Sequence, residues 1–253
     1  MELKGKVVIV TGASSGIGQA IARRFVQEGA TVAGVARNEA ALQTFAVMQP
    51  SGQMHPFVAD LSSESERTHC VHRIIASLGE IDILVHAAGI IGTGTIETTT
   101  LAAWDTMMNI NLGAIFHLTQ LSLSTLVPRK GNIVIISSMA GLRSFPGILA
   151  YCVSKAAVDQ FTRCVALELA PKGVRVNAVN PGVVVTQLHR TGGMTEKQYQ
   201  GFLERSKTTH PLGRVGTADE VAELVLFLAS DRASWITGAT YAMDGGRSLT
   251  CAR

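Results

Sequence analysis

Near its start the chain reads Val7-Val8-Ile9-Val10-Thr11-Gly12-Ala13-Ser14-Ser15-Gly16-Ile17-Gly18, and this segment constrains the architecture more than any other. The apolar run predicts a buried strand, and the glycines predict a tight turn into a helix. Such a turn lets a pyrophosphate approach the helix N-terminus, where free N–H groups and the helix dipole favour negative charge. The spacing is Gly-x-x-x-Gly-x-Gly rather than the commoner Gly-x-Gly-x-x-Gly. The strand before it and the helix after it favour a nucleotide-binding turn made by Gly12, Ser14, Ser15, Gly16, Ile17 and Gly18.

The same alternation of strand and helix continues along the chain. Many of the short apolar runs are apolar on consecutive residues, as in parallel strands covered on both faces. The predicted strands are 7–11, 31–36, 54–59, 83–86, 132–137, 175–179 and 240–243. The predicted helices are 16–28, 39–48, 63–78, 101–127, 150–170 and 218–228, with capping boxes expected at 63–66 and 217–220. This order predicts an α/β protein with a doubly wound sheet and right-handed crossovers.

Composition excludes several other classes of protein. Of 253 residues, 47% are hydrophobic and 16% charged, which excludes a disordered chain. The net charge of +3 comes without a run of Lys or Arg, so we expect no nucleic-acid partner. The cysteines Cys70, Cys152, Cys164 and Cys251 have neither metal-ligand nor disulfide spacing, so we expect reduced thiols and no metal site. Because we find no signal segment and no apolar run of roughly 20 residues, we expect no membrane partner and a cytoplasmic location, with the organelle left open.

No linker rich in Pro, Gly or Ser divides the chain, so we expect residues 1–253 to form one domain. Residues 186–210 break the alternation, because they are rich in Thr, Gly, Gln, Lys and Glu and carry no strand signal. They follow Pro181-Gly182, beyond the expected carboxyl end of a strand. This position favours a lid over an active site, although a surface insertion would have the same composition.

The end of the second predicted strand bears on the choice of cofactor. An acidic residue about 20 positions past the glycines would bind the ribose hydroxyls of NAD. This chain has Ala36-Arg37 there, and Ala36 cannot make such a bond. Arg37 can instead pair with a 2′-phosphate through forked, charge-assisted hydrogen bonds. A lone arginine at a strand end is usually just solvated, but the missing acid beside it favours NADP(H).

A second constellation, Tyr151-Cys-Val-Ser-Lys155, follows Ser138 by about one loop. Tyr and Lys four positions apart on a helix project from the same face. An ammonium beside a phenol favours the phenolate, so the spacing predicts that Lys155 lowers the pKa of Tyr151 from its ordinary value of about 10. A tyrosine of this kind can exchange protons near neutral pH. The competing interpretation is an ordinary amphipathic helix face.

Taken together, these motifs resemble those of the short-chain dehydrogenase/reductase family over nearly the whole chain. The matching segments are Thr11-Gly-x-x-x-Gly-x-Gly18, Asp60-Leu61, Ala87-Ala88-Gly89, Asn111, Ser138, Tyr151-x-x-x-Lys155, Asn180-Pro181-Gly182, Thr186 and Asp244-Gly245-Gly246. The resemblance implies a single Rossmann-type domain with a seven-stranded parallel sheet. Within the family, the pattern is similar to that of the 3-oxoacyl carrier-protein reductases.

The resemblance also implies which residues form the site. The further cofactor-binding residues would be Asp60, Leu61, Ala88, Gly89, Tyr151, Lys155, Pro181, Gly182, Val184 and Thr186. The catalytic residues would be Asn111, Ser138, Tyr151 and Lys155. Ser138 would hydrogen-bond the substrate carbonyl and Tyr151 would supply the proton. Asn111 would hold a water that links Lys155 to solvent, whereas Asn109, on the opposite side of the predicted helix, is expected to be structural.

One segment departs from the family pattern. This chain has His86-Ala87-Ala88-Gly89 where the family often has Asn-Asn-Ala-Gly or Asn-Ala-Ala-Gly. The first Asn of that motif usually stabilises the sheet, and a histidine can replace it because each ring nitrogen can make one hydrogen bond. We therefore expect His86 to be structural rather than a catalytic base.

These observations predict an NADPH-dependent carbonyl reductase, with a 3-oxoacyl thioester as the first substrate class. One alternative is a reductase or dehydrogenase of steroids, sugars or small dicarbonyls, and another is a non-catalytic NADPH-binding sensor or interaction module. Candidates for an apolar pocket are Met139, Leu142, Phe145, Leu188 and Tyr199. Candidates for a basic patch that receives a carrier protein are Arg143, Arg190, Lys197, Arg205 and Lys207. The helices at 101–127 and 150–170 are long and apolar-faced, and the resemblance implies that such helices pair across a two-fold axis, so we expect a homotetramer.

Overall fold

The computed structural model describes residues 1–50 and 52–250, and within them seven strands form one parallel sheet. The strands are β1 (Val7–Thr11), β2 (Thr31–Ala36), β3 (Met54–Val58), β4 (Ile83–His86), β5 (Asn132–Ile136), β6 (Arg175–Pro181) and β7 (Thr240–Met243). Their spatial order is β3-β2-β1-β4-β5-β6-β7. The order reverses between β1 and β4, which in doubly wound sheets opens a crevice at the carboxyl ends of the strands. The predicted strands are confirmed, with ends that shift by one or two residues.

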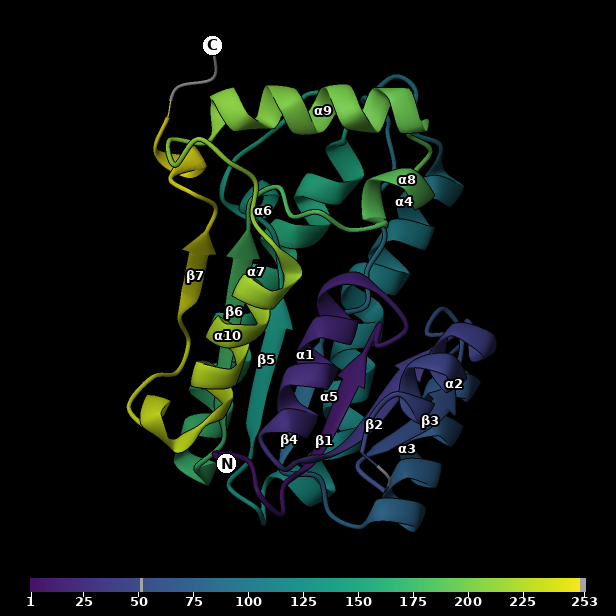
Figure 1. Cartoon of the computed structure of the whole chain (residues 1–253), viewed down its shortest axis with the longest axis vertical. Coiled ribbons are helices and arrows are strands. Elements are labelled where there is room, and N and C mark those ends of the chain that lie inside the picture. The colour runs from purple at the N-terminus through teal and green to yellow at the C-terminus, as the bar shows by residue number, and fades with distance from the viewer. Residues whose placement is uncertain (51, 251–253) are drawn as a thin grey trace.

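Helices cover both faces of the sheet (Figure 1). One layer contains α1 (Gly16–Gln27), α2 (Glu39–Val47) and α10 (Ala218–Ala229). The other contains α3 (Glu64–Leu78), α5 (Ala114–Leu126) and α7 (Leu149–Leu169). Along β1, Val8 and Val10 pack against the first layer and Ile9 against the second. The strands β1, β4 and β5 are apolar on consecutive residues because they are buried on both sides, whereas the edge strands β3 and β7 are only partly buried.

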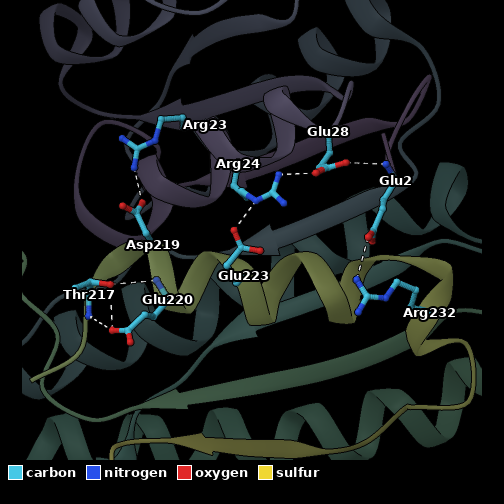
Figure 2. A network of polar contacts seen from close by, with 9 residues as sticks. All are labelled: Glu2, Arg23, Arg24, Glu28, Thr217, Asp219, Glu220, Glu223 and Arg232. Atoms are coloured by element: carbon cyan, nitrogen blue, oxygen red, sulfur yellow. Dashed lines mark hydrogen bonds and ion pairs between the residues drawn. The ribbon is translucent and has the colours of Figure 1, made fainter.

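Ion pairs join α1 to α10 at the molecular surface (Figure 2). Arg24 of α1 donates to Glu28 at 2.6 Å and to Glu223 of α10 at 2.6 Å. Arg23 of α1 forms an ion pair with Asp219 of α10. Exposed pairs of this kind contribute about 0–1 kcal/mol each, so the apolar contact between the two helices is the main stabilising interaction.

The helix starts test the predicted capping boxes. The box at Thr217–Glu220 is confirmed at the start of α10. At α3, Ser63 accepts from the Glu66 N–H, but the Glu66 carboxylate accepts from the N–H of Asp60 at 2.7 Å. The second predicted box is therefore only half formed. A further box, Thr195–Gln198, starts a helix that we did not predict.

The predicted helical stretch over 101–127 is confirmed, but it contains a π-helical turn that was not predicted. The segment consists of α4 (Leu101–Met108), a π-helical turn (Asn109–Gly113) and α5. Asn109 is held on one side, where its amide donates to the Ser62 carbonyl at 2.8 Å and its oxygen accepts from Arg67 at 3.2 Å. These contacts agree with the structural role expected for Asn109. Such π turns insert a residue into a helix and are frequent near functional sites.

Residues 186–210 contain two helices, α8 (Leu188–Thr191) and α9 (Glu196–Thr209). In Figure 1 the strands point upward and α9 crosses above their carboxyl ends. The short helix α6 (Met139–Leu142) follows β5 at the same end of the sheet. No helix in the described part of the chain is long and apolar enough to cross a membrane.

The cysteines agree in part with the expectation of reduced thiols. Among the residues that the structure describes, Cys70, Cys152 and Cys164 are free. Burial raises the pKa of Cys70 to about 11, so this thiol is unreactive at neutral pH. Cys251 lies outside the described residues.

His86 ends β4 in a fully enclosed position. Its side chain is 2% exposed, and its Nε2 shares a hydrogen bond with Thr119 Oγ1 at 3.0 Å. Burial lowers the pKa of His86 from 6.5 to about 3, which keeps the ring neutral. A neutral, hydrogen-bonded histidine inside the sheet matches the structural role predicted for it.

Replacing His86 by Asn should make the protein less sensitive to acid. Because the folded-state pKa lies below that of the unfolded chain, the unfolded state binds a proton first as the pH falls below 6.5, and stability is lost. Between neutral pH and about pH 5 this single group accounts for about 2 kcal/mol of unfolding free energy. Urea unfolding across that range should show a correspondingly smaller loss in His86→Asn. The exposed His72→Asn serves as control, and an unchanged pH dependence in His86→Asn would refute the assignment.

Candidate active site

A cavity of about 1200 Å³ lies at the carboxyl ends of the strands, over the point where the strand order reverses. The predicted cofactor-binding residues from the glycine-rich turn to Thr186 all line it. Ser138, Tyr151 and Lys155 line it as well, from the loop after β5 and from α7. Of the predicted catalytic and cofactor-binding residues, Asn111 alone is not part of the lining.

The glycine-rich turn has the backbone shape that its sequence requires. Gly12 and Gly16 have φ angles of +72° and +55°, a region that side chains with a Cβ rarely adopt. A Cβ on Gly12 would lie 3.0 Å from the Ala88 backbone, so β1 and β4 meet closely here. A Cβ on Gly18 would collide with the Gly12 carbonyl, so α1 also packs directly against the turn.

The start of α1 is open to an anion. Ser15 precedes the helix without a side-chain capping bond, and the first turn carries no acidic residue. The helices α2, α3, α4, α9 and α10 are all capped by side chains. The first N–H groups of α1 therefore remain available at the cavity wall, where the helix dipole adds positive potential. Together with the positive-φ glycines, this geometry fits the pyrophosphate of a dinucleotide.

Arg37 and Asp60 follow the ends of the neighbouring strands β2 and β3. Arg37 is exposed at the cavity edge. Asp60 accepts from the Ser62 N–H at 2.9 Å, and this bond, with a smaller effect of the Arg37 charge, holds the pKa of Asp60 below its usual value. No ion pair joins Arg37 to an acidic side chain within the described residues, so its donors remain available to the cavity.

Tyr151 and Lys155 are both buried on the first turns of α7, with 7% and 4% of their surface exposed. The Lys155 ammonium donates to the Ile136 carbonyl at the end of β5 at 2.8 Å. It lies 5.8 Å from the centre of the Tyr151 ring. Ser138 begins α6, where its Oγ accepts from the Ala140 N–H at 3.1 Å.

The prediction that Lys155 acidifies Tyr151 is wrong for the protein chain by itself. Burial raises the pKa of Tyr151, and a hydrogen bond with Ser138 only opposes that rise. Burial also lowers the pKa of Lys155 to about 8, against the influence of Asp159. Desolvation of the phenol therefore outweighs the Ser138 hydrogen bond, and the Lys155 ammonium makes its hydrogen bond to a backbone carbonyl.

Asp159 and Asn180 form hydrogen bonds that fix the segments carrying Ser138 and Lys155. Neither residue was predicted to have a role in the site. The Asn180 amide donates to Asp159 at 2.9 Å and to the Ser138 carbonyl at 3.0 Å. This links β6 to α7 and to the loop that carries Ser138. Burial raises the pKa of Asp159, while its hydrogen bonds with Ser137 and Asn180 oppose the rise. The spacing offered one signal, because Asp159 follows Lys155 by four residues on the same helix face.

Asn111 is fully buried in the π-helical turn. Its Oδ1 accepts from the Ile90 N–H at 2.9 Å, and its Nδ2 donates to the Ile90 carbonyl and to Ser154 Oγ, both at 3.0 Å. The side chain therefore fixes the segment after Gly89. Both N–H groups of Nδ2 are in use, so a water linked to Lys155 would have to donate to an oxygen of Asn111.

The predicted pocket residues separate into two groups. Met139, Phe145 and Leu188 line the cavity, but Leu142 and Tyr199 do not. Tyr199 is completely buried, and its hydroxyl donates to the Thr186 carbonyl at 3.0 Å. Tyr199 therefore connects α9 to the start of the 186–210 segment through a buried hydrogen bond. Lining residues that sequence reasoning missed come from separate loops and helices, namely Ile90, Ile91, Ile148, His189, Phe202 and Arg247.

Most residues of the predicted basic patch bind other parts of the protein. Arg190 pairs with Glu196 at 2.7 Å, and Lys207 pairs with Glu204 at 2.7 Å. Of the five predicted basic residues, Arg205 alone lines the cavity within the described chain.

Comparison with known proteins agrees with this geometry. The family model described as enoyl-(acyl carrier protein) reductase matches residues 12–248. The chain is 37% identical to the 3-oxoacyl-[acyl-carrier-protein] reductase of Thermotoga maritima, over 97% of this chain and 99% of that protein. It is 36% identical to 2-(S)-hydroxypropyl-CoM dehydrogenase 3 of Xanthobacter autotrophicus, over 96% and 97%.

A solved structure shares both the fold and much of the sequence. A short-chain dehydrogenase/reductase of unknown function from Caenorhabditis elegans, determined with cofactor, superposes with a TM-score of 0.93 at 32% identity. The match covers 100% of this chain and 98% of that one. The glycine-rich turn, the seven-stranded sheet and these similarities lead to one conclusion: the chain belongs to the short-chain dehydrogenase/reductase family.

Proposed function

We propose that this protein is an NADPH-dependent carbonyl reductase in which Tyr151 gives a proton to the oxygen of a ketone as hydride reaches its carbon. The observation that carries the proposal is the convergence of Ser138, Tyr151 and Lys155 on the same cavity as the uncapped start of α1. Nothing in the packing of a sheet requires these two features to meet in one cavity.

The cofactor, when bound, supplies the hydride. The N–H groups at the start of α1 would hold its pyrophosphate, and Arg37 its 2′-phosphate. Asp60 and Leu61 would border the adenine. Lys155 would hold the ribose nearest the reacting ring.

The raised pKa of Tyr151 suits a proton donor. A buried phenol keeps its proton at neutral pH, so Tyr151 is ready to donate when a carbonyl oxygen becomes negative. Hydrogen bonds from Ser138 and Tyr151 to that oxygen would stabilise the developing charge. The nearby Lys155 ammonium would then stabilise the phenolate left behind.

Residues 186–210 are proposed as the lid. They supply Thr186, Leu188 and Phe202 to the cavity lining, and α9 lies across the carboxyl ends of the strands (Figure 1). The anchoring of Tyr199 to Thr186 fixes one edge of the segment. Closure over a bound substrate would exclude water from the reacting atoms.

The substrate class is proposed from the relatives. The Thermotoga protein is named as a 3-oxoacyl-[acyl-carrier-protein] reductase, so a 3-oxoacyl thioester is the first substrate to test. Relatives named for butanediol and dihydroxybenzoate chemistry keep small carbonyls in second place. Exposed apolar residues on α5 and α7, among them Phe116, Val153 and Leu167, support the predicted homotetramer. That assembly and the cytoplasmic location remain predictions.

Replacing Tyr151 by Phe should abolish turnover, because the proton donor is lost while the ring and its packing remain. General acid catalysis contributes about 10²–10⁴-fold, so the rate of NADPH oxidation with a responsive ketone or acetoacetyl thioester should fall by at least about 100-fold. NADPH affinity, measured by fluorescence titration, should stay nearly unchanged. Tyr241→Phe, in β7 and outside the cavity lining, is the matched control. Undiminished turnover in Tyr151→Phe would defeat the proposal, and tight NADPH binding without any turnover of wild type would favour the sensor alternative.

The choice of NADPH over NADH should depend on Arg37. A charge-assisted hydrogen bond contributes about 1.5–3 kcal/mol, so Arg37→Gln should weaken NADPH binding by about tenfold or more and leave NADH binding little changed. Arg23→Gln removes a charge from α1 outside the cavity and should have no such effect. The assignment fails if wild type binds NADH as tightly as NADPH.

A further inference from the structure

The lid end of the cavity, formed by residues from α8, α9 and the turn after β7, is strongly basic. Arg205 of α9 and Arg247 both line it. The Arg247 side chain also packs over the Phe145 ring, 5.5 Å from its centre, and contacts Thr209. Two guanidinium groups thus border the side of the cavity where the proposed substrate would enter.

A third arginine, Arg143, holds the segment that carries Arg247 in place. Arg143 donates to the backbone carbonyls of Arg247, Ser248 and Thr250, with 3.1 Å to the Ser248 oxygen. These bonds hold the segment after β7 against the loop after α6. Arg143 therefore positions the segment that carries Arg247, through bonds made by its Nη1.

Carboxylates do not neutralise the two lining arginines. Within the part of the chain that the structure describes, no ion pair joins Arg205 or Arg247 to an acidic side chain. Glu204, next to Arg205, pairs with Lys207 instead. Asp244 is near, but its two oxygens accept from the N–H groups of Gly246 and Ser248.

The positive charges of Arg143, Arg205 and Arg247 repel one another when no anion is bound. Burial lowers the pKa of Arg247, and the neighbouring charges of Arg205 and Arg143 lower it further, while Asp244 opposes them. Arginine does not lose its proton in proteins, so the repulsion persists. An incoming anion would relieve it.

A further polar atom at this end has no partner. His189 of α8 lines the cavity and packs against Phe202, with ring centres 4.7 Å apart. Its Nδ1 is buried and makes no hydrogen bond to any described residue. Phe202 and Arg205 are three residues apart on α9 and hence neighbours on its surface. His189, Phe202 and Arg205 therefore lie together at the lid end of the cavity.

We infer that the lid end of the cavity binds an oxyanion carried by the carbonyl substrate, a carboxylate or a phosphate, through Arg205 and Arg247. Planar guanidinium forks match either group in geometry and charge. The inference rests on the proposed carbonyl reduction and narrows its substrates to those with a negative group some distance from the ketone.

Three related substrates separate the sources of the anion. Acetoacetate carries a carboxylate, acetoacetyl-coenzyme A carries phosphates, and acetoacetyl-N-acetylcysteamine is a neutral thioester. Arg205→Gln should raise KM for at least one anionic substrate by about tenfold, with little change in kcat and little change for the neutral thioester. Arg247→Gln should act in the same direction. An effect on acetoacetate alone identifies a carboxylate, and an effect on the coenzyme A thioester alone identifies a phosphate.

Lys207→Gln is the matched control, because it removes the same charge from α9 outside the cavity lining. Equal changes in KM for neutral and anionic substrates, an equal effect of Lys207→Gln, or no effect of either arginine variant would overturn the inference. If none of the three compounds is reduced, the proposed reduction of 3-oxoacyl compounds fails. Calorimetric binding of acetoacetate and coenzyme A to the NADP⁺-loaded protein then decides the inference separately: weaker binding in Arg205→Gln supports it, and equal or undetectable binding refutes it.

Discussion

A buried ammonium joins the parts of this site. Lys155 donates to the Ile136 carbonyl at 2.8 Å and so ties α7 to the end of β5. A buried charge is costly unless it is paired and hydrogen-bonded, and here the carbonyl and Asp159 offset that cost in part. The pKa of Lys155 remains lowered because the compensation is incomplete. The position of the Tyr151 ring follows from this anchor, since both side chains leave the same face of α7.

Hydrogen bonds of Asp159 and Asn180 connect α7 to the neighbouring strand β6. Asp159 accepts from Asn180 in β6, and Asn180 also donates to the Ser138 carbonyl. The loop that presents Ser138 and the helix that presents Tyr151 are thus fixed relative to one another. On the other side of the crevice, the close approach of Gly12 to Ala88 sets the position of the anion-accepting start of α1. Preorganisation of this kind limits the reorganisation that the reaction requires.

Most of the fold was predictable because buried parallel strands and their turns leave strong local patterns. The seven apolar runs, the positive-φ glycines and the Thr217 capping box all act over a few residues. The cavity lining at the ends of the strands followed from the same logic. The π-helical turn at Asn109–Gly113 was not predictable, because it is fixed by Ser62, Arg67 and Ile90, which are distant in sequence.

The electrostatics of the site were the least accessible to sequence reasoning. The four-residue spacing of Tyr151 and Lys155 correctly predicts a shared helix face, but it does not reveal how deeply both groups are buried. Burial reversed the expected shift in the pKa of Tyr151. In the same way, the arginines at the lid end come from segments that only the folded chain brings together.

The most direct test of the central claim is the pH dependence of kcat/KM for carbonyl reduction by the wild-type protein. Lys155 carries its charge below its pKa of about 8 and loses it above, so reduction should decline as the pH rises through about 8. A rate that stays constant well beyond that point, and falls only where the phenol of Tyr151 itself would ionise, would contradict the account.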